Sequence, residues 1–400
     1  MAGKLSKMRE SLGFSLDEVA AEAGWSKQRL STLERTDDAD ATDALVLTDL
    51  YGVDVEELLD DGLDELQMPA SALLRARHED VSARTRFAIT RAASVARDAR
   101  RLQEMRGLDT GWECIEAYRH RPEDGDPGVA EDLAQQVRGR LDLAAGQAIG
   151  SVSKRIERMG ILLIWTELDA EVDAVSMAAP DLGGVIVANA AGDHMQTGCH
   201  RRVTLAHELC HILFDRPRMN SLDRFCVTGS VDENAEHRDN IERRARAFPA
   251  YLLAPRTAVD RIRRSTATLE EKVASVMDTF GLGYEATRHH LHFLGALPRD
   301  RELKVSADPS KWDAADPIPD PTHDTVQRVA LQAGIDPMRV QVLLPLVTTR
   351  DGVSDSVARE MLRANPKQWD EICLAAFGQS VRTWGTPSSA FHDDDDAAGC

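Results

Sequence analysis

Apolar residues recur three to four positions apart along most of the chain, which is the spacing of an α-helix with one buried face. Two short apolar runs, 160–165 and 184–189, instead predict β-strands. The pattern therefore indicates an α+β fold that is mainly α with a small β-sheet. The predicted helices cover 5–12, 16–23, 27–35, 73–105, 130–143, 241–255 and parts of 325–376.

The first sixty residues show the layout of a helix-turn-helix. Ser15 is a candidate N-cap, and Glu18 three residues later completes a capping box. Gly24 ends this helix, and the next predicted helix begins at Lys27 after a turn of three to four residues. This spacing predicts two helices that pack against each other as in DNA-binding helix-turn-helix units.

This unit resembles the XRE (Cro/repressor-like) family. The resemblance implies that the second helix enters the major groove, with Lys27, Gln28, Arg29 and Ser31 facing bases or phosphates of double-stranded DNA. Only six Lys and Arg occur in the first sixty residues and 37–61 is acidic, so a dimerisation or substrate-docking module remains the alternative. The matching residues are Leu16 to Ala20, Gly24, Ser26, Leu30, Leu33, Glu34, Leu47, Leu50 to Val53, Leu58 and Leu59.

The most informative stretch is H-E-x-x-H at 207–211, inside an apolar-rich run. On a helix, His207 and His211 lie on one face and can reach a single metal ion. Glu208 follows the first histidine, where its carboxylate can act on the attacking water rather than bind the metal. Zinc peptidases use this arrangement together with a third ligand. The alternative is a pair of histidines that are solvated or hydrogen-bonded.

A third ligand is expected from the predicted helix 241–255. Its apolar stripe is formed by Ile241, Ala245, Phe248 and Leu252, and Glu242 lies on or near this stripe. A carboxylate on an inward face needs a partner, and a metal ion is a suitable one. The alternative partner is an arginine, although we expect Arg243, Arg244 and Arg246 to point elsewhere. Pro249 should distort the middle of the helix and Pro255 should end it.

The region from about 130 to 297 resembles the ImmA/IrrE family of metallopeptidases. The family motif R-F-T-L-A-H-E-L-G-H aligns with 202–211, and E-x-x-A-N-x-F-A-A-x-L-L-M-P aligns with 242–255. The short strand 184–189 and the segment from Gly283 to Gly295 also match. The resemblance implies a zincin-like domain with His207, His211 and Glu242 as metal ligands and Glu208 as general base. The metal is expected to be Zn²⁺, with Mn²⁺ or another divalent ion as alternatives.

The chain departs from the family pattern at four positions near these motifs. Cys210 replaces a glycine, Arg246 an asparagine and Pro249 an alanine, while Asp215 stands where many members have a histidine. Asp215 is a candidate partner for the free ring nitrogen of His211, or else a solvated residue at a helix end. Cys210 is expected to be a buried, inert thiol. Candidates for stabilising the oxyanion, by chain neighbourhood only, are Tyr251, Tyr284, His289, His290 and His292.

Composition places these motifs in a soluble, multidomain chain. No apolar run approaches 18 residues, and the six cysteines show no C-x-x-C pairing, so we expect a cytoplasmic protein with reduced thiols and no membrane association. The net charge of −19 argues against bulk attraction to nucleic acid but leaves a local DNA reader open. The expected division is a helix-turn-helix domain at 1–61, a helical connector at 62–127, the peptidase domain at 128–298, a linker at 299–322, a small helical module at 323–385 and a disordered acidic tail at 386–400.

These observations favour a zinc-dependent endopeptidase fused to a helix-turn-helix domain. The resemblance implies a protein substrate such as a repressor or antitoxin, whose cleavage switches on a stress or mobile-element response. The alternative is a DNA-binding regulator, or an antitoxin or phage-defence component, in which the peptidase fold is a sensor or interaction body. The intact Glu208 argues against that alternative, because a purely structural metal site needs no base. The oligomeric state stays open, with a homodimer among the options.

Overall fold

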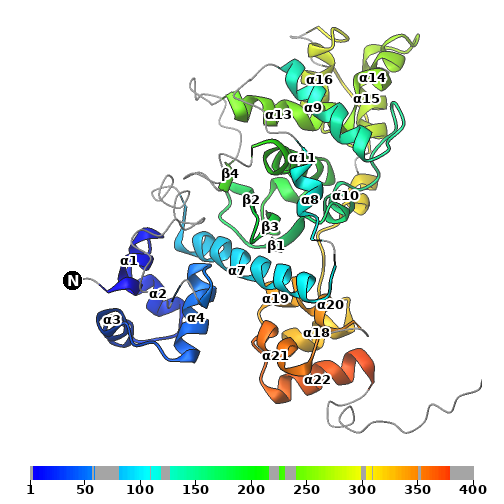
Figure 1. Cartoon of the computed structure of the whole chain (residues 1–400). Coiled ribbons are helices and arrows are strands. Elements are labelled where there is room, and N and C mark those ends of the chain that lie inside the picture. The colour runs from blue at the N-terminus through cyan, green and yellow to red at the C-terminus, as the bar shows by residue number, and fades with distance from the viewer. Residues whose placement is uncertain are drawn as a thin grey trace, which may run out of the picture. The chain divides into compact units, whose positions relative to one another are not determined.

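The computed structural model describes residues 3–55, 58, 81–108, 110–118, 127–215, 225–229, 240–298, 303–308, 310–349 and 353–378. It divides into two compact units, Met1–Pro319 and Asp320–Cys400. Figure 1 shows that helices predominate around one small sheet, which confirms the predicted α+β class. The expected acidic tail 386–400 lies outside the described residues, as do 59–80 of the connector.

Four short helices form the N-terminal part: α1 (Lys4–Ser11), α2 (Leu16–Glu22), α3 (Lys27–Thr36) and α4 (Ala41–Tyr51). The first three correspond to the helices predicted at 5–12, 16–23 and 27–35. The capping box is present, since Ser15 accepts from the Glu18 backbone while the Glu18 carboxylate accepts from the Ser15 backbone. Gly24 has φ 67°, a left-handed conformation that lets the chain turn sharply between α2 and α3. Leu30 and Leu33 of α3 are buried against this small core.

The described part of the connector is a long helix, α7 (Ala83–Met105), followed by the short α8 (Trp112–Glu116). Helix α7 packs on α4 with one side and on the sheet with another, which explains why most of its residues are buried. Arg86 of α7 pairs with Glu18 of α2 at 3.1 Å, and Ser82 at its N-cap donates to Asp169 in the peptidase region. The connector therefore joins its neighbours by side-chain contacts.

The sheet has the strand order β1-β3-β2-β4. Strands β1 (Leu162–Thr166) and β3 (Gly183–Asn189) are parallel, whereas β2 (Val172–Ala179) is antiparallel to β3 and to β4 (Phe225–Gly229). Every residue of β3 is buried, because α7 packs against β3 and so does α11 (Gly198–Phe214). The predicted strands at 160–165 and 184–189 correspond to β1 and β3.

Helix α11 lies at the centre of the main core. It contacts β2, β3 and α13 (Asn240–Leu253), and its apolar residues Leu205, Leu209, Ile212 and Phe214 are buried in one cluster with residues of α13. Pro249 lies inside α13, yet the helix continues to Leu253. The remaining elements around this core are α9 (Pro127–Arg140), α10 (Val152–Arg158), η1 (His194–Gln196), α14 (Arg256–Arg263), α15 (Leu269–Phe280) and α16 (Tyr284–Phe293).

The described part of 299–322 is not the linker that the sequence analysis expected. It contains α17 (Ser310–Ala315), and the residue after this helix, Asp316, is buried. The Asp316 carboxylate accepts from Arg202 of α11 at 2.6 Å and from the Val152 and Ser153 backbones at the start of α10. Trp312 lies over the Arg202 guanidinium, 4.1 Å from Cζ to the ring centroid. The Asp- and Pro-rich composition suggested a linker. This expectation was wrong because composition does not show partners that are distant in the sequence.

The second unit consists of the expected short helices: α18 (Thr325–Gln332), α19 (Pro337–Val342), α20 (Leu344–Val347), α21 (Asp355–Leu362) and α22 (Pro366–Phe377). The turn between α2 and α3 recurs here between α18 and α19. The backbone N–H of Trp25 donates to the Ala20 carbonyl, and the backbone N–H of Ile335 donates to the Ala330 carbonyl, five residues back in each case. Gly334 has φ 85°, matching the left-handed Gly24. The same bond, five residues back and next to a left-handed glycine, also ends α1, α7, α10 and α16, so it is a general helix ending in this chain.

No helix among the described residues is both long enough and apolar enough to cross a membrane.

Candidate metal centre

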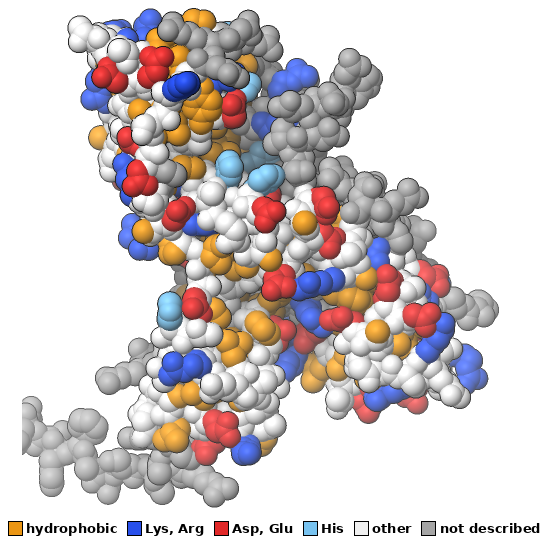
Figure 2. Space-filling view, turned by 180° about the vertical axis from the view of Figure 1, so that it is seen from behind, with side chains coloured by type: hydrophobic (Ala, Val, Ile, Leu, Met, Phe, Trp, Pro, Cys, Tyr) orange, Lys and Arg blue, Asp and Glu red, His pale blue; other side chains and the backbone are white. Residues whose placement is uncertain are grey.

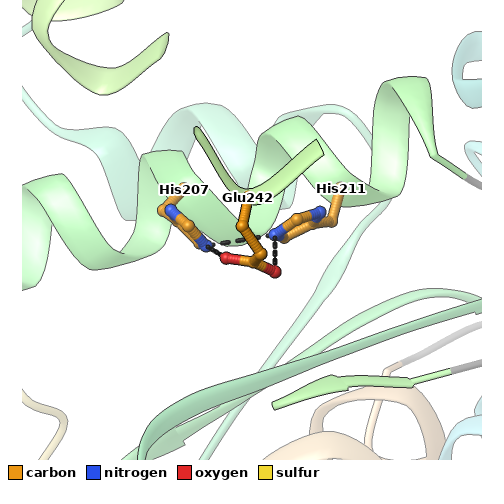
Figure 3. A group of neighbouring side chains, drawn as sticks. All are labelled: His207, His211 and Glu242. Carbon is orange, nitrogen blue, oxygen red and sulfur yellow. Dashed lines mark hydrogen bonds and ion pairs between the residues drawn. The ribbon is translucent and has the colours of Figure 1, made fainter. Parts of the chain in front are cut away.

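Helix α11 and helix α13 bring His207, His211 and Glu242 together (Figure 3). The Nε2 atoms of the two histidines are 3.0 Å apart. Glu242 Oε2 lies 3.6 Å from His207 Nε2, and Glu242 Oε1 lies 3.4 Å from His211 Nε2. Among the residues the structure describes, these three form a group of metal-binding side chains whose ligand atoms all lie within 4.8 Å of one another.

The hydrogen bonds of His211 indicate that this donor set suits a cation. His211 Nδ1 lies 3.0 Å from Asp215 Oδ2, and a carboxylate accepts, so Nδ1 carries the proton. In the neutral imidazole, His211 Nε2 is then the unprotonated nitrogen, and it presents a lone pair toward the Glu242 carboxylate. Two electron-rich atoms facing each other at this distance repel unless a cation lies between them. Two imidazoles and one carboxylate are also the ligands that zinc uses in peptidases.

The group is recessed but can be reached from solvent. The side chains of Glu242 and His207 are 27% and 10% exposed, whereas Glu208 is fully buried beside them on α11. Figure 2 shows histidine side chains gathered beside a hollow on one face of the molecule.

The structure decides between the two interpretations of Asp215 and corrects the expectation for Arg244. Asp215 is buried and contacts His211, so it is not a solvated helix end. Arg244 was expected to point elsewhere, but it is buried and forms an ion pair with Asp215. The signal was present in the sequence, because Arg244 lies three residues after Ile241 and four before Phe248, on the apolar stripe.

The remaining departures from the motif leave this arrangement intact. Cys210 is a buried, free thiol, and burial raises its pKa above the ordinary value, so it stays protonated. This agrees with the expected inert thiol. Pro249 does not interrupt α13, which still places Glu242 beside the histidines.

Three of the five oxyanion candidates are held by backbone groups. Tyr284 donates to the Leu303 carbonyl at 3.1 Å, and His292 Nδ1 lies 3.1 Å from the Leu297 carbonyl oxygen. His290 is buried and donates to the Ala254 carbonyl at 2.7 Å, and burial lowers its pKa to about 4. Tyr251 packs edge-on against the His290 ring, 4.9 Å between centroids, and His289 is exposed. These contacts give His290, His292 and Tyr284 structural roles.

On α3, all four predicted DNA-contacting residues are exposed, namely Lys27, Gln28, Arg29 and Ser31. The two cations have acidic neighbours within the same unit. Lys27 Nζ lies 2.8 Å from Asp17 Oδ2, and Arg29 Nη2 lies 2.6 Å from Asp43 Oδ1. Arg29 also lies over the Trp25 ring at 4.7 Å. The helix therefore presents a polar surface whose positive charge is partly compensated.

Two family models match separate parts of the chain. Residues 156–292 match the family model described as the IrrE N-terminal-like domain of peptidase M78, and residues 1–60 match the model described as a helix-turn-helix domain. The chain thus has the ImmA/IrrE plus helix-turn-helix architecture that its motifs indicate. A search of curated proteins finds no match.

Proposed function

We propose that this protein is a metal-dependent endopeptidase that binds one zinc ion through His207, His211 and Glu242. The convergence of the two Nε2 atoms and the Glu242 carboxylate carries this proposal. The match to the M78 peptidase model over the same residues supports it. A bound zinc ion would polarise the scissile carbonyl and make water more acidic.

Residues of the chain would then carry out the proton transfers. Glu208 takes a proton from the attacking water and returns it to the leaving amine, the usual double role of a carboxylate base. Its place directly after His207 on α11 supports this role, because in H-E-x-x-H metallopeptidases the glutamate at this position is the general base. His211 is held by Asp215, so that its Nε2 keeps facing Glu242.

The substrate that fits this architecture best is a DNA-associated protein, such as a repressor or an antitoxin. The helix-turn-helix domain at 1–60 supports this class, because it can bring the peptidase to the same operator as its substrate. Cleavage of such a protein would switch on the genes that it represses.

The first test is metal content by elemental analysis on the wild type, Glu242→Ala and Glu208→Gln, each purified without added metal. We expect about one zinc per chain in the wild type, loss of zinc in Glu242→Ala, and retention in Glu208→Gln. A wild type that stays without metal after reconstitution with zinc or manganese would refute the proposal.

The second test looks for proteolysis. Host-cell extract is incubated with zinc-loaded wild type or with Glu208→Gln, and new protein N-termini are identified by mass spectrometry. We expect cleavage products only with the wild type, and the intact substrate bound to Glu208→Gln. Identical N-termini in both samples would leave the chain as a metal-binding protein without peptidase activity.

A second function, DNA binding through α3, is supported by the exposure of Lys27, Gln28, Arg29 and Ser31. Selection from random double-stranded DNA should enrich a motif with the wild type, and the motif should change in Gln28→Ala, because Gln reads base edges. Failure to enrich any sequence at low salt would favour a protein-docking role for this domain.

A further inference from the structure

A buried ion pair lies directly behind the metal-ligand group. Asp215 caps the C-terminal end of α11, and its two carboxylate oxygens have different partners. Oδ2 accepts from His211 Nδ1 at 3.0 Å, and Oδ1 accepts from the guanidinium of Arg244 on α13. All three side chains are buried. The chain of contacts His211–Asp215–Arg244 thus connects the helix that supplies two ligands to the helix that supplies the third.

We propose that Arg244 and Asp215 are positioning residues that set the geometry of the metal site on both helices. This inference rests on the proposed metal-binding role of His207, His211 and Glu242. Through Asp215, Arg244 fixes the ring orientation and the tautomer of His211. Through its own place on α13, it fixes the rotation of that helix and therefore the direction of Glu242.

The hydrogen bond between His211 Nδ1 and Asp215 supports this role for His211. A histidine that binds a metal through one nitrogen usually donates from the other to a carboxylate or carbonyl, which holds the ring. Asp215 provides that carboxylate with one oxygen, while its other oxygen accepts from the guanidinium of Arg244. An asparagine in its place would turn its oxygen to one partner and its NH2 group, which is a donor, to the other.

The geometry of helix α13 relates Arg244 to Glu242. Residues two apart on a helix point about 200° away from each other, so the Arg244 side chain does not hold Glu242 by direct contact. Glu242 is the most exposed of the three ligand side chains, so packing alone does not fix it. Anchoring α13 to the end of α11 through Arg244 gives its backbone a defined rotation, and Glu242 then points to the two histidines.

The test uses full-length protein with Asp215→Asn, Arg244→Met and Arg244→Lys. Asp173→Asn is the matched control, because Asp173 also contacts a histidine, His194 Nδ1 at 3.3 Å, but that histidine is largely exposed and outside the ligand group. Zinc affinity is measured by competition with a chromophoric chelator. The absorption spectrum of the cobalt-substituted protein reports the ligand geometry, and melting of the metal-free protein shows whether each variant folds.

We expect Asp215→Asn and Arg244→Met each to weaken zinc binding by about 10- to 100-fold and to change the cobalt spectrum. Arg244→Lys should recover part of the loss, and Asp173→Asn should stay within about twofold of wild type, because it touches no ligand. The double variant Asp215→Asn/Arg244→Met should lose less zinc affinity than the product of the two single fold-changes, since both substitutions break the same chain of contacts, His211–Asp215–Arg244.

Wild-type zinc affinity and an unchanged cobalt spectrum in Asp215→Asn and Arg244→Met would overturn this inference and leave the proposed function standing. A wild type that binds no zinc would instead refute the proposed function. If Arg244→Met does not fold, Asp215→Asn decides the question, because it preserves the volume of the side chain.

Discussion

Replacing Asp316 with alanine should destabilise the first unit severely, although this residue lies in a segment whose composition resembles a linker. Arg202 and Asp316 are 0% and 1% exposed, and their charged groups are 2.6 Å apart. Removing one partner of a buried ion pair leaves an uncompensated charge, which costs about 3–5 kcal/mol. The same carboxylate accepts from the Val152 and Ser153 backbones, so the first turn of α10 loses these two acceptors as well.

The magnitude can be checked by differential scanning calorimetry on the full chain. For a domain of about 150–250 residues, each kcal/mol shifts the melting temperature by roughly 2–4 °C. The transition of the first unit should therefore move down by about 10 °C, with little change in that of the C-terminal helices. The control is Asp260→Ala, which removes a partly exposed partner of Arg263 on α14 and should cost less than about 0.5 kcal/mol.

A loss below about 1 kcal/mol in Asp316→Ala would refute the reasoning. It would mean that Arg202 finds another partner or water once the carboxylate is gone, and hence that 303–316 is not an integral part of the peptidase fold.

Three further predictions follow from particular contacts. His290 has a pKa of about 4 in the folded protein against about 6.5 in the unfolded chain, so the unfolded chain takes up the extra proton first and stability is lost as the pH falls from 6.5 toward 4. We expect this residue to contribute roughly 3 kcal/mol to that loss. In denaturant titrations, His290→Gln should therefore show a flatter dependence of the unfolding free energy on pH. Gly198→Ala should cost about 1–3 kcal/mol of stability, because its Cβ would lie 2.3 Å from the Trp312 backbone. The control Gly24→Ala meets no neighbour and should cost only the strain of its left-handed φ, about 1 kcal/mol. Equal losses of the two variants in urea unfolding would contradict the described path of 310–316. If α3 binds DNA, Lys27→Ala should reduce the slope of log affinity against log salt by about 0.9, and an unchanged slope would show that Lys27 stays with Asp17 rather than meeting a phosphate.

The local sequence was sufficient to predict α11, α13 and the helix-turn-helix. Periodicity places His207 and His211 on one face of a helix, and a capping box or a glycine marks where α2 begins and ends. These features depend on neighbours within about four residues, and such neighbours are visible in the sequence. Glu242, the proposed third ligand, was predicted from the apolar stripe of its helix together with the family motif.

Contacts between distant segments could not be predicted in the same way. Asp215 had two interpretations until Arg244, 29 residues later, was seen to pair with it. Asp316 looked like part of a linker because its partner Arg202 is 114 residues away. Whether a charged residue is solvated or buried depends on which segment covers it, and the apolar stripe of a helix does not identify the segment that packs against it.

The sequence by itself therefore determined the class of the fold, the helix that carries H-E-x-x-H and the candidate chemistry of His207, Glu208, His211 and Glu242. Only the tertiary structure decided that α13 approaches α11 at the right place and that Arg244 and Asp215 connect them. It also decided that 303–316 belongs to the core. The physical reason is that helix formation and side-chain periodicity are local, whereas the burial of a charge is stabilised only by a partner that the folded chain brings to it.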